Sequence, residues 1–277
     1  AKQCRAGLVE IGDEGVDAMS AGAIWHEILA TFMAGRQGQR LEPAELPDYA
    51  EQLLALLDRS VQKREQQGRL VPGVWWKYER RRWKRAIRQW LAGELERQRS
   101  SLLQPRYFEW AFGMESGPGS DDRSTELPLI VEQDGVRVEL QGKVDRIDAD
   151  ATAYRVIDYK SGRIPANKQL QQGVCLQVPV YMMAAETLLG QQFSGGDGLY
   201  APVGQSGRDF MLPGKNASRE ELFALTRQHL VQWASGIRAG NFPARPASDC
   251  PAYCPAAAFC RQDKDTDSDS AEELQDE

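Results

Sequence analysis

The spacing of apolar residues changes near Tyr107, and this change divides the chain into two kinds of structure. Ahead of it, apolar side chains recur at the interval of amphipathic helices, over residues 17–32, 50–66 and 74–97. In the third segment Trp76, Trp83 and Trp90 repeat every seven residues on one face, with basic residues over the rest. We therefore expect the first hundred residues to be mostly helical, with these tryptophans in the core rather than stacked on nucleic-acid bases.

Strand patterns begin after a polar loop at residues 116–124. Asp134-Gly135, a strong two-residue hairpin signal, joins the first two of three apolar runs at 127–133, 136–148 and 154–160, which predict three consecutive antiparallel strands. A helix at 170–189 follows, and Pro179 inside it predicts either a kink or a later start. The remaining pattern indicates a turn at 195–198, a hairpin of 199–203 with 208–212, and a helix at 219–239. This order predicts an α/β fold wrapped by a helical layer.

The charge of the chain is unevenly distributed. The 277 residues carry a net charge of −6, but residues 262–277 alone hold eight acidic residues and one lysine, which leaves the preceding part nearly neutral. That tail has no aromatic residue and one leucine, so we expect it to be disordered. An acidic isoelectric point therefore does not argue against a nucleic-acid partner for the rest.

Several classes of protein are excluded by what the sequence lacks. No apolar run approaches the roughly 18 residues of a membrane span, and the first residues contain no apolar signal core. We therefore expect a cytoplasmic protein that makes no membrane contact. The sequence also contains no phosphate-binding loop of an ATP motor. Because the first residue is not Met, we expect the chain to be part of a longer polypeptide.

Three of the five cysteines fall within eleven residues near the end of the predicted folded part. An odd number of cysteines without secretory features argues against a disulfide framework and favours binding of a metal or cluster by Cys250, Cys254 and Cys260. We expect Cys175, on the apolar side of its predicted helix, to be a small buried hydrophobic residue.

Charged residues interrupt the last of the three predicted strands. Asp158 and Lys160 are two residues apart in an apolar run, so their side chains point to the same face. Asp145 lies on the preceding strand, where pairing would place it beside Asp158. Two converging carboxylates repel each other, and a divalent cation removes that repulsion. The alternative is an ion pair between strands on a solvated face.

Three motifs in sequence resemble the PD-(D/E)XK nucleases of the RecB type. They are G-x-x-D-R-I-D at 142–148, D-Y-K-S-G at 158–162 and Q-x-x-x-Y at 177–181, and G-x-x-x-H at 22–26 resembles a helix of the same family. The resemblance implies a restriction-endonuclease-like core, in which a central mixed sheet is flanked by helices. It also implies that Mg²⁺ or Mn²⁺ is held by His26, Asp145, Asp158 and the Tyr159 carbonyl, with Lys160, Gln177 and Tyr181 as catalytic residues. Glu109 resembles a further family position ahead of the sheet.

The cysteines extend the resemblance to the iron–sulfur nucleases, notably the AddB subunit of bacterial helicase–nucleases and a CRISPR-associated relative. One Cys ahead of the His helix and three near the end imply a 4Fe-4S cluster held by Cys4, Cys250, Cys254 and Cys260. The spacing C-x3-C-x5-C has one residue more than the family's C-x2-C-x5-C, so zinc or an empty site stays open.

The third helix combines the tryptophan face with dense positive charge. Seven basic residues lie between positions 77 and 88, and this density suits a phosphate backbone. We predict contacts with DNA from Arg80, Arg81, Lys84, Arg85 and Arg88; the alternative is an ordinary solvated face.

We expect one nuclease domain over residues 1–261 and a tail over 262–277. Within the domain, residues 1–106 form a mainly helical part, 107–240 the catalytic α/β core and 241–261 the cysteine-rich segment. The resemblance implies a DNA exonuclease of double-strand-break repair that works with a helicase region or subunit. The alternatives are a non-catalytic DNA-binding scaffold and a stand-alone nuclease of the CRISPR-associated kind.

Overall fold

The computed structural model describes residues 16–70, 76–190, 193–205 and 207–241. The helices are α1 (Ala18–Ala34), α2 (Leu46–Gln66), α3 (Trp76–Arg99), α4 (Asn167–Gln171), α5 (Gln177–Leu188) and α6 (Arg219–Arg238), with a short 3₁₀ turn at Pro43–Glu45. Cys4, Cys250, Cys254, Cys260 and the predicted tail at 262–277 lie outside the described residues. None of the described helices is long and apolar enough to cross a bilayer.

The first three helices form a layer whose core the sequence predicted. Asp17 caps α1 by accepting hydrogen bonds from the backbone of the first turn. Trp83 and Trp90 of α3 are buried, and the Trp83 ring stacks on Trp25 of α1 with centroids 4.7 Å apart. The tryptophan face of α3 is therefore packed into the protein, as expected.

Five strands form the central sheet, in the order β1-β4-β5-β6-β7. They are β1 (Gln104–Phe112), β4 (Gly142–Ala149), β5 (Ala153–Lys160), β6 (Gly195–Pro202) and β7 (Phe210–Leu212). Only β5 and β6 run parallel, so the sheet is mixed. A separate hairpin joins β2 (Leu129–Gln133) to β3 (Val136–Leu140). The mixed sheet flanked by helices confirms the predicted α/β fold.

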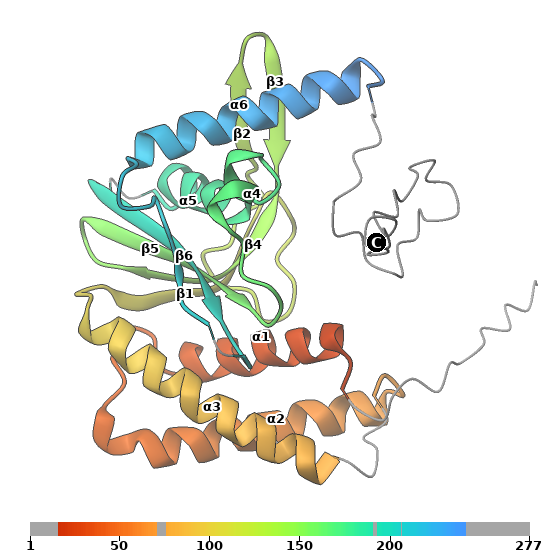
Figure 1. Cartoon of the computed structure of the whole chain (residues 1–277), viewed down its shortest axis with the longest axis vertical. Helices are drawn as coiled ribbons and strands as arrows, with labels where there is room; N and C mark the ends of the chain where they lie inside the picture. The colour runs from red at the N-terminus through yellow and green to blue at the C-terminus, as the bar shows by residue number, and fades with distance from the viewer. Residues whose placement is uncertain (1–15, 71–75, 191–192, 206, 242–277) are drawn as a thin grey trace, which may run out of the picture. The chain divides into compact units, whose positions relative to one another are not determined.

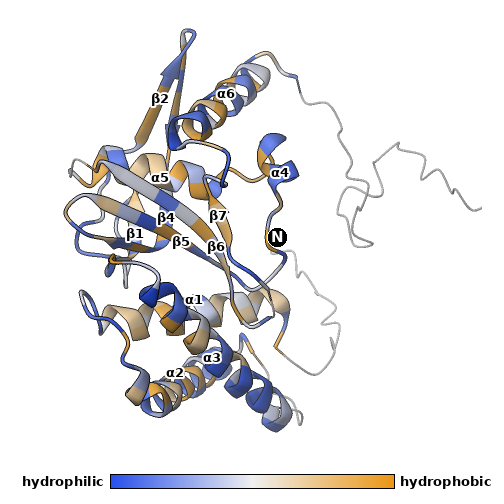
Figure 2. Ribbon diagram, turned by 60° about the vertical axis from the view of Figure 1, so that its left-hand side comes forward, coloured by the Kyte–Doolittle hydropathy of each residue, from blue (hydrophilic) through white to orange (hydrophobic). Residues whose placement is uncertain are grey.

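Each face of the sheet has its own hydrophobic core. Helices α1, α2 and α3 lie on one side of the sheet and α5 on the other (Figure 1). Residues of α6 such as Leu222 and Phe223 join the core on the α5 side. In Figure 2 the ribbon of α1 is mostly pale to orange and that of α3 mostly blue, because α1 is rich in apolar residues while α3 carries many basic ones.

The predicted strand at 136–148 is wrong, because this segment forms two strands in different sheets. The chain leaves the hairpin at Gln141, and Gly142 then pairs with Phe112 of β1 in the central sheet. The hairpin itself follows its Asp134-Gly135 signal, and both residues have positive φ. The expected meander is thus split at its middle strand.

The predicted turn at 195–198 is also wrong, since these residues form the first half of β6. Their side chains would have little room: a Cβ on Gly196 would collide with the Tyr154 ring, and one on Gly198 with Val178. Asp197 forms a bidentate pair with Arg155 on the neighbouring strand. The glycines therefore mark close packing rather than a turn.

Pro179 marks a later helix start and not a kink. The predicted helix at 170–189 is two helices, and Pro179 is the third residue of α5, where the backbone N–H has no partner within the helix. Cys175 lies in the connection between them, half-buried, with its thiol 3.1 Å from the Tyr200 hydroxyl, so its predicted place on a helix is wrong. No strand was predicted from the sequence at β1, the edge strand beside β4.

The last helix ends within one residue of its prediction. The chain divides into two compact units, and the boundary lies after Gln232. The described residues of the second unit are the final turns of α6 and the turn at Gly240. The unit up to Gln232 contains the sheet, both cores and all the site residues discussed below.

Candidate metal centre

Asp145 and Asp158 lie where the β4–β5 ladder ends. The last pair of the ladder is Arg146 with Ile157. Asp145 and Asp158 are the next residue beyond that pair on each strand. Beyond that point the Asp145 carboxylate replaces a backbone acceptor, because the Tyr159 amide donates to its Oδ2 at 2.8 Å. The strands thus hold Asp145 by a main-chain hydrogen bond beside Asp158. The metal ligand predicted on Tyr159 was its carbonyl, which remains a prediction.

His26 reaches the other Asp145 oxygen from α1. Its Nδ1 lies 3.0 Å from Asp145 Oδ1. One turn earlier, Gly22 faces the loop after Lys160, and a Cβ there would lie 2.9 Å from Ser161 Oγ. Burial lowers the pKa of His26, but the hydrogen bond and charge of Asp145, with the charges of Asp158 and Glu109, raise it overall. Gly22 of the G-x-x-x-H motif therefore allows α1, with its imidazole, to lie against the end of β5.

Glu109 completes a group with His26 and Asp145. One ligand atom from each of the three lies within 4.8 Å of the others. Glu109 has a φ of 53°, a conformation that costs a residue with a side chain roughly 1–2 kcal/mol. Burial and the charge of Asp145 raise its pKa although Lys143 pairs with it at 2.7 Å. Glu109 was not among the predicted ligands, and the sequence signal was a single acid between the aromatic residues of β1.

Asp158 is the most buried of the acids, with a side chain only 1% exposed. Lys160 Nζ forms an ion pair with its Oδ2 at 2.8 Å, and no other partner of this buried oxygen is found among the described residues. Burial and the negative charge of Asp145 raise the pKa of Asp158 to about 6, against the opposing effect of Lys160. Asp158 therefore lies beside the group of three ligands, with the Lys160 ammonium against its buried oxygen.

Gln177 and Tyr181 approach the same place from the first turns of α5. Lys160 Nζ donates to Gln177 Oε1 at 2.7 Å, and Gln177 Nε2 donates to the Tyr181 hydroxyl at 3.1 Å. Tyr181 packs on Gly142, where a Cβ would lie 2.8 Å from its ring. All the residues of the three motifs that were predicted as catalytic thus meet at one end of the sheet.

These side chains fit a divalent cation. The cluster brings together the carboxylates of Glu109 and Asp145 and the His26 imidazole, with the Asp158 carboxylate beside them. Burial and the charge of Asp145 raise the pKa of both Glu109 and Asp158, and a cation would relieve the repulsion between these carboxylates. Carboxylate oxygens favour Mg²⁺, Ca²⁺ and Mn²⁺, and the imidazole favours the transition metals.

The family model of the PD-(D/E)XK nuclease superfamily matches residues 2–261. The chain belongs to this superfamily. It therefore contains a nuclease domain, a hydrolase of the metal-dependent kind with nucleic acid as its substrate. No curated protein matches the sequence.

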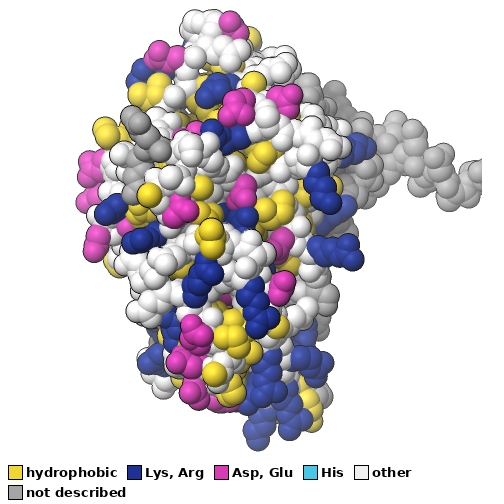
Figure 3. All heavy atoms as spheres, turned by 90° about the vertical axis from the view of Figure 1, so that its left-hand side faces the viewer, with side chains coloured by type: hydrophobic (Ala, Val, Ile, Leu, Met, Phe, Trp, Pro, Cys, Tyr) yellow, Lys and Arg dark blue, Asp and Glu magenta, His cyan; other side chains and the backbone are white. Residues whose placement is uncertain are grey.

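The structure separates the basic residues of α3 into two groups. Arg80 and Lys84 are paired with acids of α2: Arg80 binds Asp58 through two hydrogen bonds, and Lys84 Nζ lies 3.0 Å from Glu51. The other predicted DNA contacts are Arg81, Arg85 and Arg88. Like Lys77, they are exposed and form no ion pair within the described residues. Lys and Arg side chains gather at the lower end of the face shown in Figure 3, where the helical layer lies.

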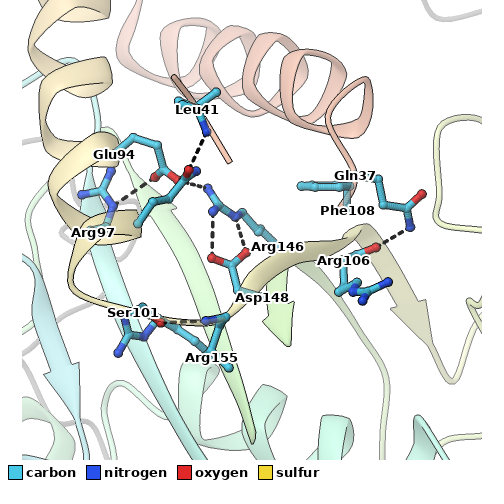
Figure 4. Close-up of polar contacts among 12 residues, drawn as sticks. Gln37, Leu41, Glu94, Arg97, Ser101, Arg106, Phe108, Arg146, Asp148 and Arg155 are labelled. Atoms are coloured by element: carbon cyan, nitrogen blue, oxygen red, sulfur yellow. Dashed lines mark hydrogen bonds and ion pairs between the residues drawn. The ribbon is translucent and has the colours of Figure 1, made fainter. Parts of the chain in front are cut away.

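A second charged cluster, which the sequence did not predict, lies on the opposite side of β4. Arg146 is 1% exposed and binds both oxygens of Asp148, at 2.5 and 2.7 Å, and Glu94 of α3 at 2.7 Å (Figure 4). Glu94 also accepts from Arg97 and Gln98. Arg146 and Asp148 belong to the G-x-x-D-R-I-D motif, so the motif itself was the available signal. This cluster ties α3 to the sheet.

Proposed function

We propose that this domain is a Mg²⁺- or Mn²⁺-dependent deoxyribonuclease whose metal is held by His26, Glu109, Asp145 and Asp158. The observation that carries the proposal is the group of three ligand atoms, from His26, Glu109 and Asp145, that lie within 4.8 Å of one another beside the buried Asp158 carboxylate. A bound cation supplies Lewis acidity toward the scissile phosphate and lowers the pKa of a bound water.

The protein's own side chains orient the reacting groups and compensate charge. The Tyr159 amide fixes one oxygen of Asp145 and His26 fixes the other, so both oxygens are held in place. Lys160 orients the attacking water and compensates charge that develops on the phosphate. Gln177 fixes the Lys160 ammonium through its side-chain oxygen, and Tyr181 fixes Gln177. Burial raises the pKa of Tyr181, which keeps its hydroxyl protonated for this hydrogen bond.

The outer face of α3 is the proposed DNA contact. Lys77, Arg81, Arg85 and Arg88 recur at helical spacing, so they form one stripe of positive charge. Arg82 of the same helix lines a cavity of about 290 Å³ together with Ser161, which directly follows Lys160. A DNA strand bound along α3 would therefore lie near a cavity that Ser161, the residue after Lys160, also lines.

The nuclease assignment is tested by cleavage of linear DNA in Mg²⁺ or Mn²⁺, with and without EDTA. We expect cleavage only with metal, and a loss of about 100- to 1000-fold in kcat for Lys160→Met. Lys168→Met, which removes an exposed lysine of α4, is the control for loss of a positive charge. Metal-independent cleavage, or full activity of Lys160→Met, would refute the assignment. No cleavage by the wild type together with DNA binding would support the scaffold alternative.

The DNA contact is tested by oligonucleotide binding in EDTA at several salt concentrations. Replacing Arg85 by Ala should weaken binding and reduce the slope of log K against log salt by about one. Arg80→Ala should cause a smaller loss, because that guanidinium is already engaged by Asp58. Equal losses in the two variants would show that the outer stripe is not the DNA contact.

The narrower role we propose is that of a cytoplasmic exonuclease in double-strand-break repair, in which the domain works with a helicase region or subunit. The support is the resemblance of its motifs and cysteines to iron–sulfur helicase–nuclease subunits. A 4Fe-4S cluster on Cys4, Cys250, Cys254 and Cys260 would join the two ends of the domain. Iron analysis with a visible absorbance spectrum tests the cluster, and bound zinc would exclude it.

A further inference from the structure

Lys143 is a second lysine at the centre, and no role was predicted for it. It lies on β4, two residues before Asp145, and its Nζ is 2.7 Å from Glu109 Oε2. Its side chain is 40% exposed, whereas that of Glu109 is 18% exposed. The exposed ammonium thus covers a carboxylate that belongs to the group of possible metal ligands.

The two lysines of the centre are held differently. Lys160 is fixed by Gln177 as well as by its contact with Asp158. Within the described residues, the Lys143 ammonium has a recorded polar contact with Glu109 alone. A long, partly exposed lysine side chain with one partner can move into solvent at little cost. Lys143 is therefore the positive charge that can leave when another cation arrives.

The charges make this exchange favourable. Without metal, Glu109, Asp145 and Asp158 are three acids in one partly buried cluster, and Lys143 compensates one of them. A divalent cation bound to Glu109 would lie beside the ammonium and repel it. The Glu109 carboxylate already lies within 4.8 Å of the ligand atoms of His26 and Asp145, so a cation could bind it there.

We propose that Lys143 is the internal counter-cation of the metal-free centre, and that a divalent metal displaces it from Glu109. The inference rests on the proposed metal site. Lys143 is thus a positioning residue that keeps Glu109 in place before the metal binds and competes with the metal for that carboxylate.

The first test is calorimetric titration with Mn²⁺ alone. Replacing Lys143 by Met should tighten Mn²⁺ binding about fivefold, since it removes an ion pair of ordinary surface strength that the metal must break. The same variant should melt at a lower temperature in EDTA and show a larger increase in melting temperature on adding Mn²⁺. Lys143→Arg, which keeps the charge, should resemble the wild type.

Lys84→Met is the matched control. Lys84 forms a comparable pair with Glu51, at 3.0 Å and 37% exposure, but away from the cluster. This variant should leave the Mn²⁺ affinity unchanged. Unchanged or weaker Mn²⁺ binding by Lys143→Met would overturn the inference, because Lys143 would then be neutral or would help Glu109 to bind metal.

The second test is the rate at which each lysine is modified by an amine-reactive reagent, measured by mass spectrometry. Mn²⁺ should speed modification of Lys143 and leave that of Lys84 unchanged. An equal rate for Lys143 with and without bound Mn²⁺ would overturn the displacement. If the wild type binds no Mn²⁺, the proposed function itself fails; if it binds but Lys143 does not respond, only this inference fails.

Discussion

Two charged clusters lie on opposite sides of β4, one around Arg146 and the other around its neighbour Asp145. The negative charges of their carboxylates are compensated to very different degrees. On one side, Glu94 and Asp148 have donors on both of their oxygens, from Arg146, Arg97 and Gln98. On the other, the buried oxygen of Asp158 has the single ammonium of Lys160 as its partner, 2.8 Å away. The first is a closed structural cluster, and the second, which has no guanidinium group among the described residues, is left incomplete.

The pKa values follow this difference only for Glu94 and Asp158. Burial raises the pKa of Glu94, but the charges of Arg146 and Arg97 outweigh it and lower the value overall. Burial raises the pKa of Asp158 too, and there the charge of Asp145 adds to the effect, so that it reaches about 6. Burial also raises the pKa of Asp148, although Arg146 binds both of its oxygens. The two clusters are therefore distinguished by their donors, since guanidinium groups bind Glu94 and Asp148, whereas Asp158 lies beside Asp145 and a single lysine.

The largest expected effect is on the closed cluster. Arg146→Ala would leave Glu94 and Asp148 buried without their main partner, and should lower the free energy of unfolding by about 3–5 kcal/mol. Urea denaturation measures this change. Arg137→Ala is the matched control, because Arg137 also pairs with two acids, Glu132 and Glu139, but is 49% exposed. Its loss should be under about 1 kcal/mol. Equal losses would remove the distinction that we draw between buried and exposed clusters.

The incomplete cluster should respond in the opposite direction. Asp158→Asn removes a charge that the metal-free fold disfavours, and should raise the free energy of unfolding in EDTA at pH 7.5 while cleavage is lost. A pKa of about 6 in place of the ordinary 3.8 corresponds to a gain on the order of 3 kcal/mol.

The size of that gain depends on pH. The wild-type penalty is complete above pH 6, where Asp158 is ionised in both states, and disappears as pH falls toward 4, because the folded state takes up a proton first. The stability difference between Asp158→Asn and the wild type should therefore shrink between pH 7 and pH 4. A constant difference, or a less stable variant in EDTA, would contradict the incomplete compensation of this cluster.

The smallest expected effect concerns the packing that supports the centre. Gly142→Ala would place a Cβ 2.8 Å from the Tyr181 ring and 2.9 Å from Phe112, an overpacking that costs about 1–3 kcal/mol. Because Tyr181 supports Gln177, which binds Lys160, kcat should fall while Mn²⁺ affinity stays the same. Gly162→Ala is the control, since a Cβ there meets nothing within 4 Å. A matching loss in that variant would show that Gly142 has no special packing role.

Prediction from sequence succeeded where the residues themselves determine local structure. The helical spacing located α1, α3 and α6, and the Asp134-Gly135 pair located a hairpin turn. It failed at 195–198, where consecutive glycines resembled a turn but lie in a strand against Tyr154 and Val178. Such packing depends on residues far away in the chain, so the local sequence does not reveal it.

The candidate site was predictable in part for the same reason. The motifs identified Asp145, Asp158 and Lys160, and strand pairing explains why they meet. Glu109 lies on β1, and its place in the ligand group depends on a left-handed backbone that nothing in Tyr107-Phe108-Glu109-Trp110 announces. The separation of Arg80 and Lys84 from the other basic residues likewise requires the acids of α2.

The order of residues by itself determined the α/β class, most helices and the set of motifs that shows the superfamily, because periodicity and spacing are local properties. Only the tertiary structure decided which charges are compensated. An arginine or a carboxylate looks the same in the sequence whether or not all its polar atoms have partners. The difference arises from groups that folding brings from α1, α3 and β1 to the two sides of β4.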